Sequence, residues 1–347
     1  MLAYYKKVGQ RVSLLDSYRM RLRRKRRLVR CIRRRRDLRT VRNNTRQIRS
    51  GDVLLMSVVR NEKIRLPYFL DYYRKLGVRH FLFVDNDSTD GTLDYLKAQP
   101  DVSVWYTNAS YRRSTFGIDW SNYLLRKYAH GHWVLTVDPD EFLIYPFCDT
   151  RPIDALTDWL DGTGVRSFGT MLLDMYPEGP IQDATYHEGQ DPFEIAAWFD
   201  SGNYMITKNP AYGNLWIQGG PRARVFFQDK PAKAPALNKI PLVKWDRRYV
   251  YVSSTHALLP RGLNQVYDEW GGEKTSGALL HAKLINTLGD KAREELQRGE
   301  HYRASGEYRA YVDQLESKPV FWCKWSEKYI NWRQLEILGL MSKGNWA

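Results

Sequence analysis

Residues 80–92 read HFLFVDNDSTDGT, an apolar run that passes directly into a polar turn. The run over 80–84 is short and does not alternate with polar residues, which is typical of a strand buried on both faces. The Asp, Asn, Ser and Gly residues that follow mark a tight turn, and Asp90 or Ser88 can cap a helix over 92–98. The stretch therefore predicts a strand, a turn and a helix in direct succession.

The same alternation continues on both sides of this stretch. Upstream, VLLMSVV at 53–59 predicts a buried strand, and apolar residues at helical spacing over 66–76, followed by Gly77, predict a helix. Downstream we expect a strand over 102–106, a helix over 118–128 and a strand over 133–137. Strands that alternate with helices are typical of a parallel sheet covered by helices, so we predict an α/β fold.

The pattern is less regular beyond residue 146. We expect strands over 165–174 and 248–254, and the Gly- and Pro-rich stretch 177–241 is typical of loops that lie over a site. Residues 279–284 form a short apolar segment, and the chain from 286 onward is expected to be helical.

Charge is distributed very unevenly along the chain. Residues 1–50 contain 19 Lys or Arg and two Asp, whereas the other residues contain 35 Lys or Arg and 37 Asp or Glu. The near-neutral remainder argues against a nucleic-acid-binding body. The leading segment has few apolar residues and many helix-forming Arg residues, so it is expected to be a basic helix. It could be a solvated arm, a helix that lies on anionic lipid, or an RNA- or DNA-binding arm.

The cysteines favour a reducing compartment. Cys31, Cys148 and Cys323 are far apart and odd in number, which fits neither a disulfide framework nor a zinc site. No apolar run approaches the roughly 20 residues that span a bilayer, and no secretory signal begins the chain. We expect a cytoplasmic protein, or one that is peripheral on the inner face of the plasma membrane.

Acidic residues follow two of the predicted strands. Asp138-Pro139-Asp140 comes directly after 133–137, and Asp85-Asn86-Asp87 directly after 80–84. Parallel α/β sheets bind ligands at the carboxyl ends of their strands. The pair Asp138 and Asp140 suits Mg²⁺ or Mn²⁺, which could neutralise a diphosphate. Asp85 and Asp87 could accept hydrogen bonds from a nucleotide, and the loop Val59-Arg60-Asn61-Glu62 could close over it.

Taken in order, these motifs resemble the donor half of the family 2 glycosyltransferases. The resemblance over 53–146 rests on Arg60-Asn61-Glu62, the turn ending in 88–92, a helix with Gly117 and Asn122, and Asp138-x-Asp140. The variant DPDEFL at 138–143 is similar to a bacterial branch of that family. The segment LLHAK at 279–283, with Ala282 in place of an aromatic residue, and the motifs at 299–302 and 307–308 extend the resemblance to about residue 315.

The resemblance implies a GT-A fold and transfer from a nucleotide-sugar donor to a glycan or lipid-linked glycan, in bacterial surface polysaccharide synthesis. It implies a bound Mn²⁺ or Mg²⁺ on Asp138 and Asp140, completed by a histidine, for which His281 is the first candidate and His256 the second. Lys283, Arg112 and Arg113 are candidates for contacts with the diphosphate. It also implies inversion with a carboxylate as general base. The candidates for that base are Asp174, Glu194 and Asp200, because the Glu-Asp pair that is usual in the family is not evident.

This interpretation divides the chain into a basic arm (1–50), a catalytic domain (51–285) and a helical extension (286–347). The catalytic domain would comprise a nucleotide-sugar half (51–146) and an acceptor half (147–285). One alternative is a nucleotidyltransferase, although residues 59–62 lack the Gly-rich loop expected of one. Another is a nucleic-acid- or membrane-binding protein that acts through the Arg-rich N-terminus, and a third is an inactive scaffold.

Overall fold

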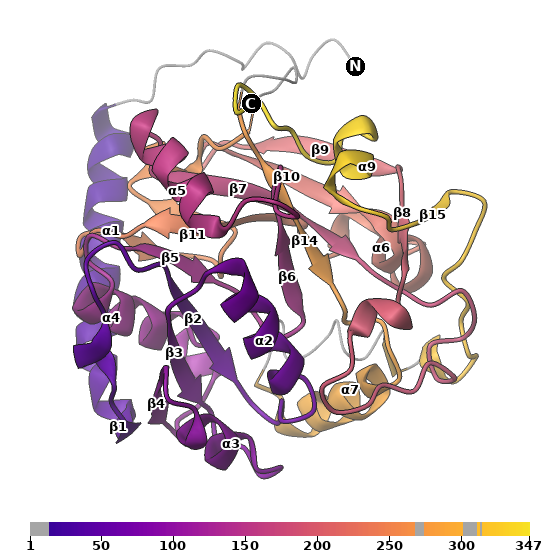
Figure 1. Ribbon diagram of the computed structural model, residues 1–347, viewed down its shortest axis with the longest axis horizontal. Coiled ribbons are helices and arrows are strands. Elements are labelled where there is room, and N and C mark those ends of the chain that lie inside the picture. The colour runs from indigo at the N-terminus through magenta and orange to yellow at the C-terminus, as the bar shows by residue number, and fades with distance from the viewer. Residues whose placement is uncertain (1–13, 268–273, 301–310, 313) are drawn as a thin grey trace.

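A nine-stranded mixed sheet forms the centre of the computed structural model, which describes residues 14–267, 274–300, 311–312 and 314–347 (Figure 1). In spatial order the strands are β1 (Arg39–Arg42), β4 (Val102–Tyr106), β3 (His80–Asp85), β2 (Leu54–Val59), β5 (Trp133–Thr136), β11 (Asn238–Lys244), β7 (Ser167–Asp174), β14 (Gly277–His281) and β6 (Glu141–Ile144).

Most strands of this sheet run the same way. Parallel pairing joins β4, β3, β2 and β5, and separately β7 and β14, whereas β1, β11 and β6 are antiparallel to their neighbours. The predicted α/β class, with a mostly parallel sheet and flanking helices, is confirmed. Parallel strands end at one edge of a sheet, so the turns after β2, β3 and β5 meet there.

Helices cover both faces of the sheet. On one face α2 (Leu66–Leu76) and α5 (Ile153–Gly162) pack with Leu55, and on the other α4 (Ile118–Tyr128) packs with Leu54. Side chains of successive strand residues point to opposite faces, so both faces of β2 are apolar and both are buried. The short helix α3 (Thr92–Ala98) lies between β3 and β4 in the chain.

The stretch 177–241 is not a set of loops, and that expectation was wrong. It contains β8 (Trp198–Asp200), which pairs with β15 (Ser326–Lys328), a hairpin of β9 (Tyr204–Asn209) and β10 (Asn214–Gly219), α6 (Gly220–Phe226) and most of β11. Its Pro residues hid the strand β11, because Pro cannot donate to a ladder. The register of β11 against β7 shifts between Lys239 and Leu242, and this irregularity accommodates Pro241.

Other expectations were met in part. The strand over 248–254 is reduced to β12 (Val250–Tyr251), which pairs with β13 (Leu258–Leu259). After residue 286 the described chain has α7 (Thr287–Arg298) and α9 (Trp332–Ile337), together with β15. The resembling positions 301–302 and 307–308 lie outside the described residues.

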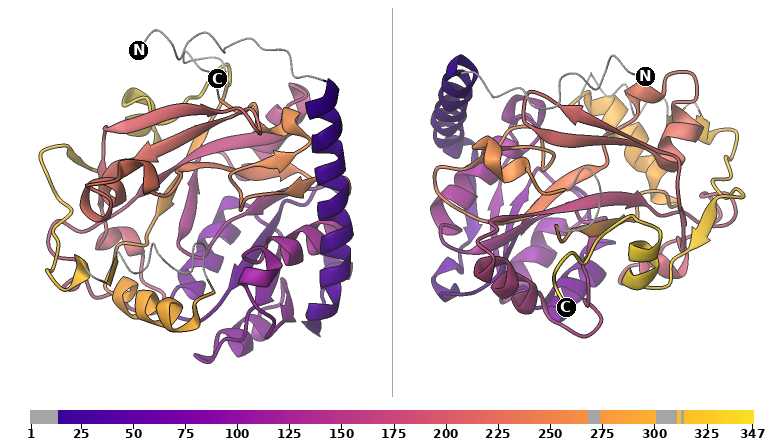
Figure 2. Two further views of the ribbon diagram at one scale, coloured as in Figure 1. Left: turned by 180° about the vertical axis from the view of Figure 1, so that it is seen from behind. Right: turned by 90° about the horizontal axis from the view of Figure 1, so that it is seen from above.

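The basic segment is joined to the body of the protein. Its helix α1 (Leu14–Arg34) runs along one side of the molecule beside α4, as both views in Figure 2 show. Residues 39–42 then form β1, which adds to the sheet by antiparallel pairing with β4. Within the described residues, no helix is both long enough and apolar enough to cross a membrane.

Candidate active site

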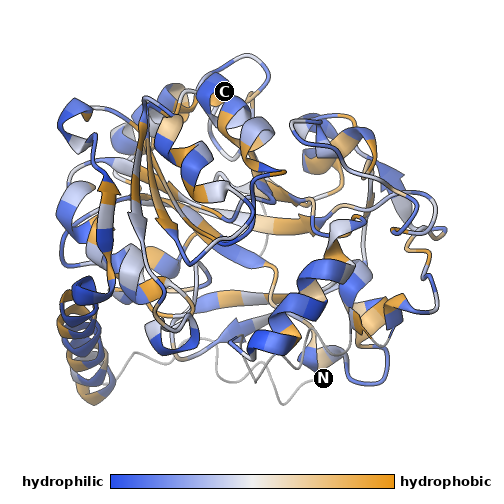
Figure 3. Ribbon diagram, turned by 90° about the horizontal axis from the view of Figure 1, so that it is seen from below, coloured by the Kyte–Doolittle hydropathy of each residue, from blue (hydrophilic) through white to orange (hydrophobic). Residues whose placement is uncertain are grey.

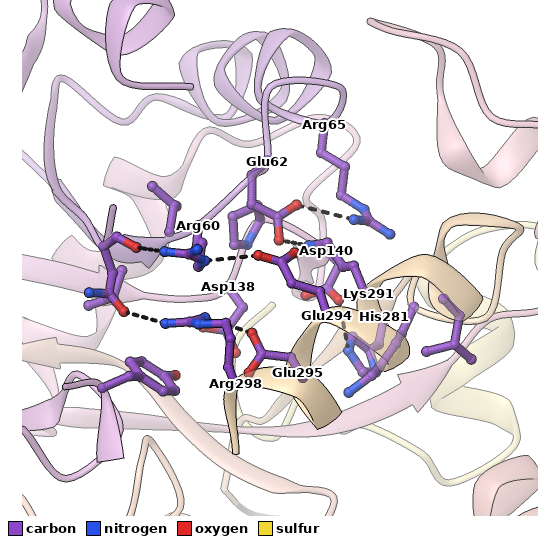
Figure 4. Close-up of a pocket in the computed structure, with 17 residues that line it drawn as sticks. Arg60, Glu62, Arg65, Asp138, Asp140, His281, Lys291, Glu294, Glu295 and Arg298 are labelled. Atoms are coloured by element: carbon purple, nitrogen blue, oxygen red, sulfur yellow. Dashed lines mark hydrogen bonds and ion pairs between the residues drawn. The ribbon is translucent and has the colours of Figure 1, made fainter. Parts of the chain in front are cut away.

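A pocket opens where the strand ends meet, and several chain segments line it (Figure 4). They include the end of β2 and the loop that follows it up to α2, the turn after β3, the loop between β4 and α4, the turn between β5 and β6, the end of β14, and α7. The lining residues are Val58, Val59, Arg60, Glu62, Arg65, Asn86, Tyr111, Asp138, Pro139, Asp140, His281, Lys283, Leu288, Lys291, Glu294, Glu295 and Arg298.

Strand register brings His281 to Asp140 and Asp174. In the ladders of β14, His281 is paired with Asp174 of β7 on one side and with Glu141 of β6 on the other. Asp140 directly precedes Glu141, and its carbonyl accepts a hydrogen bond from Ala282 N at 2.8 Å. The backbone therefore holds these three side chains together independently of any contact between them.

Asp174 fixes the ring of His281. Its Oδ1 lies 2.6 Å from Nδ1 of His281, and its Oδ2 accepts from Nε of Arg222 at 2.7 Å. Burial alone would raise the pKa of Asp174, but Arg222 and His281 lower it to about 2, so the carboxylate is ionised and can only accept. Nδ1 of His281 therefore carries a proton, and Nε2 is directed at Asp140 Oδ2, 3.4 Å away.

Asp140 and His281 suit a divalent cation. Burial would raise the pKa of Asp140, but His281 and the neighbouring cations lower it, which keeps the carboxylate charged. Ligand atoms about 2.0–2.2 Å from one ion lie roughly 3 Å apart, and the 3.4 Å between Oδ2 and Nε2 is close to that separation. Asp138 is exposed beside them and lines the same pocket.

The described residues contain no group of three His, Cys, Asp or Glu side chains arranged to hold a metal. This is compatible with Mg²⁺-type sites, where one or two protein carboxylates act together with oxygens of a bound phosphate. The residues present therefore fit an ion that binds together with a phosphorylated ligand.

Helix α7 supplies a polar wall that the sequence interpretation did not assign to the site. Glu294 Oε1 accepts from Arg60 Nε at 2.9 Å and from Asn61 Nδ2 at 2.8 Å, and Lys291 pairs with Glu62. Arg298 Nη2 donates to Asn86 Oδ1 at 3.2 Å. Residues 291, 294, 295 and 298 have the spacing of positions on one face of a helix. This spacing of charged residues in the sequence could have indicated the polar wall.

The turn after β3 is only partly in the pocket. Asn86 lines it, and its Nδ2 donates to the carbonyls of Thr107 and Ala109, both at 3.1 Å. Asp85 is fully buried and accepts from Ser88 N, while its Oδ2 has no hydrogen-bond partner among the described residues. Asp87 accepts from Tyr106 Oη at 2.7 Å and does not line the pocket.

Other predicted site residues lie away from the pocket lining. Asp200 pairs with Arg224 at 2.9 Å and accepts from Tyr176, Glu194 accepts from Gln190, and His256 Nδ1 contacts Asn238 O at 2.6 Å. Arg112 and Arg113 are in a 3₁₀ turn before α4 and do not line the pocket either. The general base stays a prediction for Asp174, Glu194 and Asp200, none of which is in the lining.

No protein-family model and no curated protein matches the sequence. Among solved structures, a mannosyltransferase from Pyrobaculum calidifontis in complex with GDP-mannose and Mn²⁺ is similar at a TM-score of 0.27 and 17% identity, over 48% of this chain and 47% of its own.

Two further solved structures are similar at the same level. A protein from Bacillus anthracis described as a glucose-1-phosphate thymidylyltransferase, in complex with sucrose, has a TM-score of 0.24 and 10% identity over 40% of this chain and 64% of its own. A 4-diphosphocytidyl-2C-methyl-D-erythritol synthase has a TM-score of 0.25 and 16% identity over 42% of this chain and 67% of its own. These likenesses are weak, so any assignment of function rests on the pocket.

Proposed function

We propose that the protein is a glycosyltransferase that uses a nucleotide-sugar donor together with Mn²⁺ or Mg²⁺. The observation that carries the proposal is the contact of Asp140 Oδ2 with His281 Nε2, 3.4 Å apart, at the wall of a pocket lined by both basic and acidic side chains. Its acceptor would be a glycan or lipid-linked glycan, as the resemblance to family 2 enzymes implies.

The charge of the pocket supports a requirement for a cation. Its lining holds the bases Arg60, Arg65, Lys283, Lys291 and Arg298 and the acids Glu62, Asp138, Asp140, Glu294 and Glu295. These formal charges cancel. A diphosphate would therefore add uncompensated negative charge, which a bound divalent cation would offset as a Lewis acid.

The protein side chains would divide the remaining work. Asp140 and Nε2 of His281 would hold the cation, and Asp174 would orient the imidazole through Nδ1. Lys283, whose Nζ lies 5.5 Å from the centroid of the Tyr311 ring, would place its charge near the diphosphate. At the end of β3, Asn86 lines the pocket and would meet the nucleoside, whereas Asp85 is fully buried and lies outside the lining.

A thermal-shift experiment tests the donor site. We would measure the melting temperature with UDP, GDP, ADP, CDP and dTDP, each in Mn²⁺ and in EDTA. A diphosphate at about 100 times its Kd stabilises by about 2.7 kcal/mol, which for a chain of this length is a rise of about 4 °C. The rise should disappear in EDTA and in Asp140→Asn.

The reaction itself is tested by product analysis. Release of a nucleoside diphosphate from a nucleotide sugar supports glycosyl transfer. Formation of pyrophosphate from a nucleoside triphosphate and a sugar phosphate would instead identify a nucleotidyltransferase. A folded protein that is stabilised by no nucleoside diphosphate and yields neither product would refute both.

A further inference from the structure

The helix α1 presents two chemically different faces, and only one of them is used inside the protein. The inner face rests on α4 and on the β12–β13 pair. The outer face is exposed along the length of the helix, which lies at the rim of the molecule in the hydropathy view (Figure 3).

Specific contacts fix the inner face. Arg30 Nε pairs with Asp119 Oδ2 at 2.6 Å, and the Asp119 side chain is fully buried. Arg27 Nη1 donates to Thr115 Oγ1 at 3.1 Å, and Cys31 is fully buried. Arg30 and Arg34 both donate to the carbonyl of Arg113, at 2.6 and 3.1 Å. These contacts determine how the helix is rotated about its axis, and therefore which residues face outward.

Large apolar side chains occupy the outer face. Leu14 is 90% exposed, Leu15 70%, Tyr18 63%, Val29 49% and Ile32 37%. At 100° per residue these positions fall within a single sector of about 100°. Leaving such side chains in water forgoes the free energy of burial, so the arrangement fits a face that is covered by an apolar phase.

Exposed cations accompany this apolar stripe. Arg19, Arg21, Lys25, Arg26 and Arg33 are all exposed on α1. Arg19 has a neighbour of opposite charge in Asp16 at 3.5 Å, and both side chains are largely exposed. By the same spacing Arg19, Arg21 and Arg26 flank the apolar sector, whereas Lys25 and Arg33 lie within it. A helix face that combines apolar side chains with Arg and Lys is typical of helices that lie in the plane of a membrane interface.

We propose that the outer face of α1 docks on an anionic lipid bilayer, with the helix lying flat in the headgroup region. Its apolar side chains would enter the acyl boundary while the basic side chains pair with lipid phosphates. The phosphate backbone of a nucleic acid would satisfy the basic side chains but would offer no apolar phase for the leucines and the isoleucine, so lipid is the partner that matches both features.

Docking in this way would fix the orientation of the whole protein. The 21-residue helix is about 31 Å long at 1.5 Å per residue, and its inner face is clamped to α4 and to the loop before it. The bilayer plane would therefore be parallel to α1 and would hold the pocket at a constant distance. This inference does not depend on the ligand of the pocket.

Vesicle flotation of the purified full-length protein tests the inference. Phosphatidylcholine vesicles containing phosphatidylglycerol should bind it, binding should weaken as salt rises, and vesicles of phosphatidylcholine alone should bind it far less. The triple variant Leu15→Gln, Val29→Gln, Ile32→Gln should lose more than tenfold in partitioning, and Arg26→Gln should lose about fivefold.

Matched controls distinguish binding through this surface from nonspecific hydrophobic binding to vesicles. Ile206→Gln and Ile337→Gln remove exposed apolar side chains elsewhere, 59% and 85% exposed, and should leave flotation unchanged. Unchanged melting temperature and continued protection of the Cys31 thiol would show that α1 is still docked in each variant.

Two outcomes would overturn the inference. One is flotation that the triple variant leaves intact. The other is a protein that binds neither kind of vesicle but does bind duplex DNA or RNA. Its affinity for the nucleic acid would then fall in Arg26→Gln but not in the triple variant. The second result would assign α1 to a nucleic acid instead.

Discussion

His281 and Asp174 are joined by a hydrogen bond of 2.6 Å between Nδ1 and Oδ1, deep behind the pocket wall. The bond sets the tautomer of the imidazole and turns Nε2 toward Asp140. A carboxylate that orients a histidine in this way raises the basicity of the other ring nitrogen. On the proposed function, the pair would orient Nε2 for a cation before any ligand arrives.

Replacing Asp174 should weaken cation binding without touching the pocket lining. In Asp174→Asn we expect Mn²⁺ to bind in the presence of nucleotide about 10- to 100-fold more weakly, because the orienting charge is lost. Isothermal titration measures this. The variant also leaves Arg222 without its anionic partner, at a cost of about 3–5 kcal/mol of stability.

The matched control for that loss is Asp200→Asn. Asp200 is also a buried carboxylate paired with an arginine, Arg224 at 2.9 Å, but it lies outside the pocket lining. It should lose comparable stability and keep its Mn²⁺ affinity. Equal Mn²⁺ affinities for Asp174→Asn and the unchanged protein would contradict the orienting role.

Glu294 is expected to oppose the binding of a diphosphate. Its Oε1 accepts hydrogen bonds from Arg60 Nε at 2.9 Å and from Asn61 Nδ2 at 2.8 Å, so these donors are already engaged. Its carboxylate also places a negative charge in the pocket. Glu294→Gln should bind the preferred nucleoside diphosphate about fivefold more tightly, which is the effect of removing an interaction of roughly 1 kcal/mol. Titration at constant Mn²⁺ measures the change.

Asp290→Asn removes the same charge from the same helix as a control. The Asp290 side chain is 89% exposed and pairs with Arg293 rather than with a pocket residue. Its nucleotide affinity should stay unchanged. A decrease in affinity for Glu294→Gln would show instead that this carboxylate contributes to the nucleotide site.

The thiol of Cys31 reports the docking of α1. Burial raises the pKa of Cys31 to about 12, so at pH 8 the Cys31 thiol should react with an aromatic disulfide reagent only after α1 separates from the body. Asp119→Asn, which breaks the pair with Arg30, should raise the reaction rate about tenfold or more.

Cys148 provides an internal reference for this rate. Burial also raises its pKa, to about 11, and it lies far from α1 in the sequence, just after β6. Its reactivity should be the same in both proteins. If both thiols became faster together, Asp119→Asn would be loosening the whole fold rather than α1.

Gly277 is required at the start of β14. A Cβ atom there would lie 2.4 Å from the carbonyl oxygen of Ile144 and 2.8 Å from the ring of Phe168. Gly277→Ala should cost about 1–3 kcal/mol and displace the strand that carries His281, so both melting temperature and Mn²⁺ affinity should fall. Gly262→Ala, where nothing lies within 4 Å, should change neither.

Local signals predicted the first half of the fold well. The bounds of α2, α3, β4 and α4 agree with the apolar spacing and, for α2, with the stop at Gly77, whose φ of 111° lets it end the helix. These elements bury side chains in the periodicity of their own secondary structure, so residues close in sequence were enough to define them.

Long-range pairing was harder to foresee. β11 enters the middle of the sheet between β5 and β7 despite Pro241, and nothing local to 238–244 indicates those partners. The same limit applies to β1, a four-residue strand inside an Arg-rich segment. Asp140 and His281, which the sequence suggested as ligands of one ion, lie 3.4 Å apart, and their role as ligands stays a prediction. The contact of α7 with Arg60 depends on tertiary docking, and no local signal indicated this partner.

The strand register that aligns Asp140, Asp174 and His281 also determines where the chain can tolerate insertions and deletions. A one-residue insertion within β6, β7 or β14 would turn the following side chains to the opposite face and dismantle the site. Segments between these strands, such as the β9–β10 hairpin, carry no such restriction. The length of these connections can therefore vary during evolution or engineering, whereas the number of residues within each of the three strands must stay the same.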